Sequence, residues 1–328
     1  MPFLQKFFLL VSSCLILASA QAVASDQIGM RSAVLPDHPK RIVVLEFLFA
    51  ESLAALDLTP IGMVDPDRYR EWIGYDNPRF SQVVDIGTRQ QPSLEAIARL
   101  KPDLIVGVTF RHAALFDAFE RIAPTVLFNF NATNHNVNQL DHALKLFDTF
   151  ATITGRAAAG KKVEQDVQTA LASDRARLAA AGLAGKRLAV LQELGLQDMY
   201  WAYATNSMAG GIAQKLGLSL WPNWPTKEGT TFVSSEDLLK QNDMHVLMIS
   251  ATGPEVGLAQ KLNSPIWRYV PARRAGHVAL VPRNIWGFGG PMSAIKLSHQ
   301  LTDAMLAAGL GGGAVTALST IAPETSSR

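Results

Sequence analysis

The segment NQLDHALKLFDTFATIT, residues 138–154, lies near the middle of the chain and decides how the rest is interpreted. Its apolar residues recur at intervals of three and four, the spacing that places side chains on one face of a helix. These residues are Leu140, Ala143, Leu144, Phe147, Phe150 and Ala151. Gly155 is placed to end the helix. The pattern predicts one long amphipathic helix between the two halves of the chain.

The segments on either side of this helix repeat one pattern. PSLEAIARLKPDLIVGV at 92–108 and VSSEDLLKQNDMHVLMIS at 233–250 each predict a capped amphipathic helix, a turn and a buried strand. Glu95 in the first segment matches Glu236 in the second. Because repeated patterns usually indicate repeated architecture, the sequence predicts two Rossmann-like α/β lobes joined by a single long α-helix, with a ligand cleft between the lobes.

The expected organisation of the chain follows from this repeat. We expect a signal peptide at 1–24, an N-terminal lobe at 38–136, the connecting helix at 137–157, a C-terminal lobe at 158–308 and a disordered tail at 309–328. The tail consists mainly of small and polar residues.

Residues 1–24 have the composition of a secretory signal. A lysine precedes an apolar run over 7–17, and Ala-Val-Ala at 22–24 suits a signal peptidase. The run is shorter than the ~20 residues that span a bilayer. Cys14, the only cysteine, lies in a lipobox-like context, but the apolar run continues past it. We therefore expect Cys14 to be removed with the signal, leaving a cysteine-free periplasmic protein without thiol chemistry or disulfides.

Composition excludes several functional classes. The 328-residue chain has a formal net charge of +2 with acids and bases intermixed, so no phosphate-binding surface is predicted and nucleic acid is not an expected partner. No Walker loop, G-x-S-x-G elbow, H-E-x-x-H or paired-cysteine motif occurs, and the seven histidines are scattered singly. No catalytic residue, cofactor or metal site is predicted. An exported, two-lobed, monomeric solute receptor is the simplest interpretation.

The segment DPDRYREWIGYDNPRF, residues 65–80, is rich in arginine and aromatic residues. Arg68, Tyr69 and Trp72 are suited to hold a flat or anionic ligand. A solvated surface insertion with Trp72 tucked under it is the alternative.

Two arginines are predicted at the carboxyl ends of strands, where ligands bind in open α/β sheets. Arg89 follows one strand end, and Arg111 with His112 follows the strand after the next helix. A guanidinium matches a carboxylate in two-point geometry, so both arginines and His112 are candidate ligand-binding residues. The alternatives are a turn residue paired with a local acid for Arg89, a solvated helix start for Arg111 and a local hydrogen bond for His112.

Two loops of the second half carry aromatic residues without periodicity. WPNWP at 221–225 contains Trp224, and the glycine-rich IWGFGGP at 285–291 contains Trp286 and Phe288. The second loop lacks the G-x-G-x-x-G spacing of a nucleotide site. All three aromatic residues are candidate ligand contacts on the cleft rim.

Three segments carry a resemblance to a known family. RIVVLEFLFAESLAALDL at 41–58, VVDIGTRQQPSLEAIARLKPDLIVGVTFRHA at 83–113 and WGFGGPMSA at 286–294 resemble the periplasmic ferric-siderophore and ferric-citrate binding proteins of iron-uptake ABC transporters. The resemblance implies the helix-linked, class III type of binding protein, and delivery of the ligand to a permease with a cytoplasmic ATPase.

The resemblance also implies residue roles. Glu95 and Glu236 would dock on permease arginines; first-turn placement on a helix is the alternative. Arg89 and either Trp286 or Phe288 match ligand positions of hydroxamate-siderophore binders. Glu228 stands where such receptors carry a tryptophan, and Phe110-Arg111 replaces a tyrosine.

These departures leave the ligand as a ferric siderophore of citrate type, hydroxamate type or both. A haem or corrinoid receptor fits the same fold, and a two-lobed Rossmann-type enzyme fits the outline.

Overall fold

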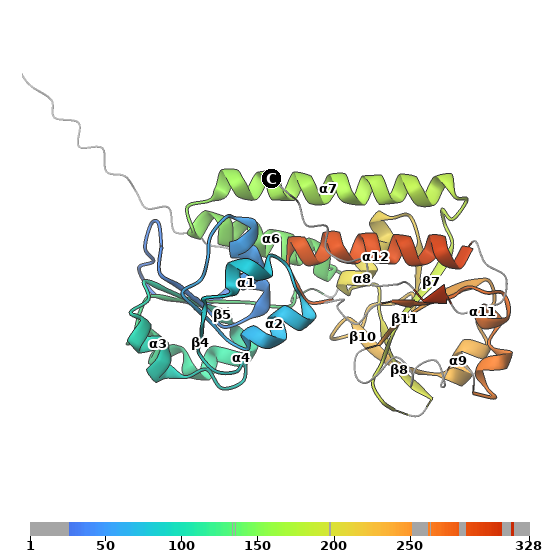
Figure 1. Cartoon of the computed structure of the whole chain (residues 1–328), viewed down its shortest axis with the longest axis horizontal. Coiled ribbons are helices and arrows are strands. Elements are labelled where there is room, and N and C mark those ends of the chain that lie inside the picture. Colours follow the sequence, from blue (N-terminus) through green and yellow to red (C-terminus); the bar gives the residue numbers. More distant parts are fainter. Residues whose placement is uncertain are drawn as a thin grey trace, which may run out of the picture.

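The computed structural model describes residues 26–132, 134, 136–196, 198–250, 262, 264–281, 287–309 and 316–317. The predicted signal peptide, Cys14 and Trp286 lie outside the described residues. Figure 1 shows two α/β lobes beside each other, with α6 (Gln139–Ile153), α7 (Ala157–Ala180) and α12 (Pro291–Gly309) along one side. Within the described part of the chain, no helix has the length and apolar character needed to cross a membrane.

The N-terminal lobe is built on a six-stranded sheet with the order β1-β6-β5-β2-β3-β4. All strands run parallel except β1, which pairs antiparallel with β6. Their bounds are β1 Ile28–Arg31, β2 Ile42–Val44, β3 Gly62–Met63, β4 Val84–Asp85, β5 Leu104–Val108 and β6 Thr125–Phe128. The edge strand β1 lies upstream of residue 38, where the sequence pattern begins the lobe. Its half-exposed IGMR sequence carries no core signal.

Five α-helices connect these strands. They are α1 Phe47–Ala55, α2 Pro66–Trp72, α3 Leu94–Leu100, α4 Thr109–His112 and α5 Phe116–Glu120. Because β2, β3, β4 and β5 are parallel, the loops that follow them leave the same edge of the sheet.

The C-terminal lobe contains a second sheet, with the order β10-β8-β7-β11-β12-β13 and with β9 also paired to β7. The central strands are β7 Arg187–Glu193, β11 Met244–Ser250 and β12 Val278–Val281, and they are parallel. The remaining strands are β8 Met199–Tyr203, β9 Ser219–Trp221, β10 Thr230–Ser234 and β13 Thr316–Ala317. The helices are α8 Met208–Lys215, α9 Ser235–Leu239 and α11 Pro271–Arg274.

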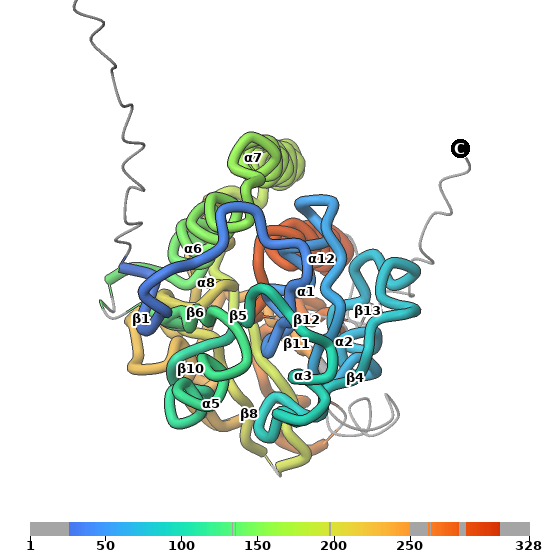
Figure 2. The backbone as a smooth tube through the Cα atoms, turned by 90° about the vertical axis from the view of Figure 1, so that its left-hand side faces the viewer, coloured from blue at the N-terminus to red at the C-terminus, as the bar shows by residue number. Residues whose placement is uncertain are grey.

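The two lobes share a helical hairpin. Leu140 near the start of α6 belongs to the C-terminal core, whereas Phe147 near its end belongs to the N-terminal core. The 24-residue α7 runs back, with Val163 in the N-terminal core and Leu171 in the C-terminal core. The predicted two-lobed α/β fold with a long helix is confirmed, and α6 and α7 cross the junction together. Figure 2 shows α6 and α12 beneath α7.

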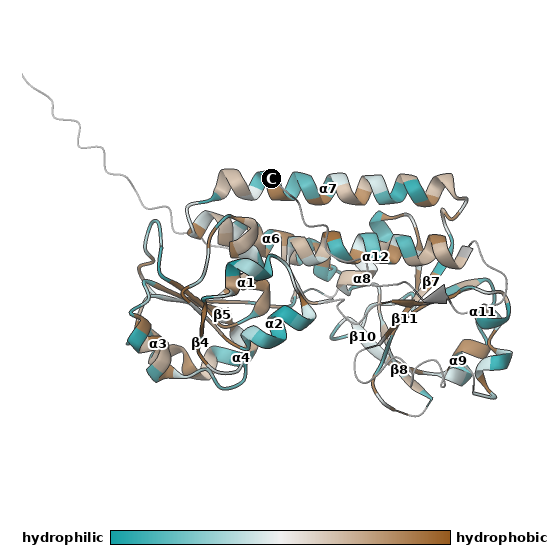
Figure 3. Ribbon diagram, in the orientation of Figure 1, coloured by the Kyte–Doolittle hydropathy of each residue, from teal (hydrophilic) through white to brown (hydrophobic). Residues whose placement is uncertain are grey.

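Local sequence explains the turn between these helices. Gly155 has φ of +69°, and a Cβ at this position would collide with the ring of His38. Figure 3 shows hydrophilic and hydrophobic residues alternating along α7, whereas the strands at the centre of each lobe are hydrophobic. The buried residues of α7 recur at intervals of three and four from Gly160 to Leu178, so one face of the helix packs on both lobes while the other faces solvent.

The repeated pattern around the hairpin is present as predicted. Ser93 caps α3 before β5, and Ser234 caps α9 before β11. Glu95 and Glu236 lie in the first turns of these helices and are exposed. Figure 1 places α3 and α9 on the side of the two lobes away from α7.

Candidate ligand-binding site

Four charged residues gather where the parallel strands of the N-terminal lobe end. Glu46 follows β2, Asp65 follows β3, Arg89 follows β4 and Arg111 follows β5. We call these four residues the N-lobe rim. Ion pairs join all four, because Glu46 contacts both arginines and Asp65 contacts Arg89.

Arg89 is buried between carboxylates and aromatic rings. Its residue is 6% exposed, and its backbone N–H donates to Asp65 Oδ2 at 2.9 Å. Its guanidinium lies 3.5 Å from an oxygen of each rim carboxylate, with Nη1 near Glu46 Oε1 and Nε near Asp65 Oδ2. The guanidinium carbon lies 4.2 Å from the centre of the Phe47 ring and 5.2 Å from that of Trp72. Arg89 is therefore a fixed cation and also the partner of a local acid.

Arg111 is the more accessible of the two rim arginines. Its side chain is 23% exposed, its Nε lies 3.4 Å from Glu46 Oε2, and its guanidinium carbon lies 4.7 Å from the centre of the Phe110 ring. The Glu46 side chain is 3% exposed and accepts from the Phe47 N–H at 3.1 Å, which caps α1. One buried carboxylate thus orients both guanidiniums.

His112 is hydrogen-bonded to the backbone of the rim residue Arg89. The residue is fully buried, and its Nδ1 accepts from the Val108 N–H at 3.1 Å. Nε2 lies 3.0 Å from the Arg89 carbonyl oxygen, so the proton on Nε2 donates to that oxygen. Burial, helped by the charge of Arg111, lowers the pKa of His112 to about 4. His112 is a neutral residue that holds the Arg89 loop rather than a ligand contact.

The three candidates from the 65–80 segment lie in different environments in the structure. Tyr69 is fully buried in the N-terminal core and its hydroxyl donates to the Tyr75 carbonyl at 2.9 Å, so it does not face a ligand. Arg68 is exposed over Trp72, 5.6 Å from the ring centre. Trp72 is half-buried and meets Phe47 edge-on at 6.1 Å. Arg68 and Trp72 therefore lie beside the rim.

Three phenylalanines link the rim to the C-terminal lobe. Phe110, which is 62% exposed, lies 5.5 Å from Phe130 between ring centres. Phe130 stacks on Phe288 at 6.2 Å with an interplanar angle of 30°. We call these residues the aromatic bridge. Phe288 was a candidate from sequence, and Phe110 and Phe130 were not.

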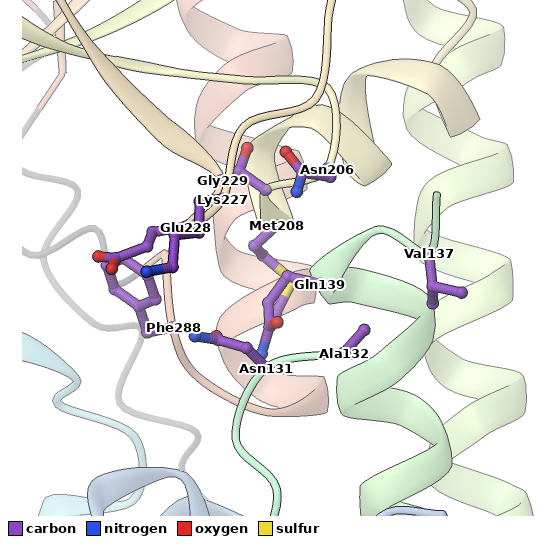
Figure 4. Close-up of a pocket in the computed structure, with 11 residues that line it drawn as sticks. Asn131, Ala132, Val137, Gln139, Asn206, Met208, Lys227, Glu228, Gly229 and Phe288 are labelled. Carbon is purple, nitrogen blue, oxygen red and sulfur yellow. The ribbon is translucent and has the colours of Figure 1, made fainter. Parts of the chain in front are cut away.

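A small hollow adjoins the bridge at the lobe junction (Figure 4). Phe288 and Glu228 lie at one end of it and Val137 at the other. Gln139 at its base donates to the Phe130 carbonyl at 2.8 Å, and Asn206 exchanges two hydrogen bonds with the backbone of Thr226. The remaining lining residues are Asn131, Ala132, Ser207, Met208, Lys227 and Gly229.

Trp224 does not join this arrangement. Trp224 is 49% exposed on the loop after β9, and no contact among the described residues connects it with the rim or the hollow. Trp286 lies outside the described residues. Among those that are described, no three His, Cys, Asp or Glu side chains are grouped to hold a metal ion.

Glu46 and Asp65 were missed by sequence analysis although a signal existed. Each lies shortly after the end of a parallel strand, as Arg89 and Arg111 do. Phe110 and Phe130 carried no comparable signal, because their contact depends on how α4 and the segment after β6 are placed. The completed arrangement offers guanidinium donors for ligand oxygens and aromatic faces for apolar groups.

Comparison with known proteins shows the family of the chain. A family model described as "Periplasmic binding protein" matches residues 42–284. The Fe(3+) dicitrate-binding periplasmic protein FecB of Escherichia coli strain K12 is 30% identical over 85% of this chain and 88% of that protein. The iron(3+)-hydroxamate-binding protein FhuD of the same strain is 27% identical over 81% and 87% of the two chains.

A solved structure extends the likeness to three dimensions. The siderophore-binding protein FhuD from Vibrio cholerae, in its Fe3+-Desferal complex, is 28% identical and superposes with a TM-score of 0.73. The match covers 82% of this chain and 98% of that one. The family model spans well over half of the sequence, and the chain therefore belongs to the periplasmic binding protein family.

Proposed function

We propose that this protein captures a ferric siderophore of hydroxamate or citrate type after export and delivers it to an ABC permease. The observation that carries the proposal is the pair of rim arginines at the ends of β4 and β5, joined by the aromatic bridge to the hollow at the lobe junction. The relatives named for ferric dicitrate and for ferric hydroxamate support the ligand class.

The rim acts by geometry more than by bulk charge. Its two arginines and two carboxylates have a formal sum of zero, so long-range attraction is weak. A siderophore already completes the coordination of its iron, and the protein needs only donors for the outer ligand oxygens. Arg111 offers exposed N–H groups, while Arg89 contributes a buried cation whose orientation is fixed.

The aromatic groups receive the apolar parts of the ligand. Trp72 borders the rim, Phe110 presents an exposed ring beside Arg111, and Phe288 lines the hollow. Aromatic faces of this kind cover hydrocarbon arms and exclude water from the donor groups. Trp286 remains a proposed contact on the evidence of its sequence position.

Delivery is assigned to the exposed acids on the matched helices. Glu95 and Glu236 lie on α3 and α9, one on each lobe and on the same side of the molecule (Figure 1). We assign them to docking on arginines of the permease, whose ATPase supplies the energy. The protein acts as a monomer in the periplasm, with the siderophore as cargo, and without a reaction or a cofactor.

A titration tests this function. Purified protein is titrated with ferrioxamine B, ferric dicitrate and haem, and tryptophan fluorescence and visible absorbance are recorded. Saturable quenching at one ligand per chain by at least one ferric complex is expected. If neither ferric complex binds while haem produces a shifted absorbance band, the protein is a haem receptor instead.

A further inference from the structure

A buried carboxylate joins the two lobes at a place separate from the rim. Glu51, on α1 of the N-terminal lobe, is fully buried. Its Oε1 accepts from the Gly290 N–H at 2.6 Å and from the Ser293 N–H at 3.2 Å, and its Oε2 pairs with the Ser293 hydroxyl. These groups form the start of α12, so a side chain of one lobe caps a helix that packs in the core of the other.

The Glu51 cap explains the glycine-rich sequence before α12. A Cβ at Gly290 would lie 2.9 Å from Glu51 Oε1. A Cβ at Gly289 would collide with the Ser293 hydroxyl oxygen and would lie 2.9 Å from Glu51 Oε2. A side chain at either position would therefore displace the carboxylate or its Ser293 partner. The glycines leave the turn just enough room for the carboxylate.

The turn held by Glu51 carries Phe288. This phenylalanine lies two residues before Gly290, stacks on Phe130 and lines the hollow. We propose that Glu51 is a positioning residue of the binding site, which holds the Phe288 turn against the N-terminal lobe at a fixed place relative to the rim. This inference rests on the proposed function, because it assigns Phe288 to the ligand site.

The cap depends on hydrogen bonds rather than on charge. Burial raises the pKa of Glu51 to about 7, against the hydrogen bonds from Ser293 and Gly290 and the charge of Lys296. Tyr69 and Tyr75 are the other titratable groups that its charge reaches. A protonated Glu51 keeps the same partners, because Oε1 still accepts while Oε2 donates to the Ser293 hydroxyl. Glutamine offers the same acceptor and donor.

Three variants test the inference. Glu51→Ala removes the cap, Glu51→Gln retains its hydrogen bonds, and Asp174→Ala is the matched control. Asp174 is a buried acid on α7 that accepts from the Ser298 hydroxyl at 2.7 Å, so it holds the same helix within the C-terminal lobe. The dissociation constant for ferrioxamine B or ferric dicitrate and the melting temperature are measured for each variant.

The expected pattern separates positioning from stability. Glu51→Ala raises the dissociation constant three- to fivefold, Glu51→Gln stays within twofold of wild type, and Asp174→Ala lowers the melting temperature without a change in affinity above twofold. Equal affinity of Glu51→Ala and wild type overturns the inference, as does an equal loss of affinity in Asp174→Ala.

A second measurement tests the cap even if Glu51→Ala folds poorly or the wild-type protein binds neither ferric complex. Backbone hydrogen exchange over residues 287–293 is compared between wild type and Glu51→Gln, and with Ser293→Ala, which removes only the hydroxyl partner. Exchange that is faster in Ser293→Ala and unchanged in Glu51→Gln supports the cap, whereas equal exchange in all three contradicts it. A wild-type protein that binds neither ferric complex refutes the proposed function, and the exchange data still decide the cap.

Discussion

The two sides of the lobe junction differ in chemistry. The N-lobe rim presents paired charges, with Arg89 and Glu46 almost fully buried, whereas the opposite side presents Phe288 and a hollow lined largely by amides and apolar groups. A rim of this kind is rigid because each charge fixes its neighbour. On the opposite side, a carboxylate from the other lobe caps the turn that carries Phe288. Under the proposed function, we therefore expect the N-terminal lobe to orient the oxygen-rich head of a ligand and the C-terminal side to adapt to its arms.

The largest expected effect tests the docking role that we assign to one exposed acid on each lobe. Replacement of both Glu95 and Glu236 by Arg is expected to abolish siderophore uptake by cells with unchanged ligand affinity, because like charges would meet at the permease. The effect is measured as uptake of radioactive ferric siderophore by cells that lack the wild-type protein and carry one variant. Glu120→Arg, at an exposed position on α5, is the control. Normal uptake by the double variant would remove both residues from docking.

Loss of Arg89 is expected to show that the charged side dominates affinity. Arg89→Ala should raise the dissociation constant tenfold or more, on the order of 1.4 kcal/mol, because Glu46 and Asp65 lose the cation that pairs them. Arg68→Ala should change it less, since Arg68 is exposed and lies 3.9 Å from Asp65. Fluorescence titration measures both variants. Equal effects of the two substitutions would mean that the buried rim is not the centre of recognition.

The aromatic side is expected to contribute less. Phe288→Ala should raise the dissociation constant about fivefold, because a stacked ring contributes roughly 0.5–1.5 kcal/mol. Phe288→Leu keeps most of the apolar surface, so its dissociation constant should lie between those of Phe288→Ala and wild type. Isothermal titration calorimetry of both variants measures the effect. A larger loss of affinity in Phe288→Ala than in Arg89→Ala would mean that the aromatic side, and not the charged rim, dominates ligand binding.

The smallest expected effect compares the acid sensitivity of the lobes. Burial lowers the pKa of His112 in one lobe and of His245 in the other to about 4, so both are neutral when folded. The unfolded chain takes up protons first, near pH 6.5, and stability is lost as pH falls from there towards 4. Between pH 7 and 6 each histidine should lower the free energy of unfolding by about 0.7 kcal/mol. Urea unfolding of His112→Gln and His245→Gln should each show a shallower loss than wild type. Parallel pH profiles for all three proteins would argue against both histidines as the cause.

Sequence patterns were sufficient for the fold because its signals are local. The repeat of a capped helix and a buried strand predicted both lobes, and the spacing over 138–154 predicted the helix at their junction. The pairing of α6 with α7 and the addition of β1 were not predicted, because both depend on contacts between distant segments.

The candidate site was predictable only in part. Strand ends placed Arg89 and Arg111 on one edge, and the same rule applied to Glu46 and Asp65 would have completed the rim. Tyr69 was misplaced because the seven residues of α2 do not show from sequence alone which face is buried. The Glu51 cap joins residues 239 positions apart, a separation at which sequence patterns carry no information. All ligand and docking roles stay predictions: those of Arg68, Trp72, Arg89, Arg111, Trp224, Trp286 and Phe288 in ligand binding, and those of Glu95 and Glu236 in docking.

The position of the iron tests the central claim most directly. A crystal grown with ferrioxamine B or ferric dicitrate and measured at the iron absorption edge yields an anomalous peak that locates the metal. We expect the peak between the N-lobe rim and the Phe288 turn, with siderophore oxygens within hydrogen-bond distance of Arg111 and no protein atom bound to iron. A peak at another surface, or iron ligated directly by side chains, would contradict capture at the lobe junction.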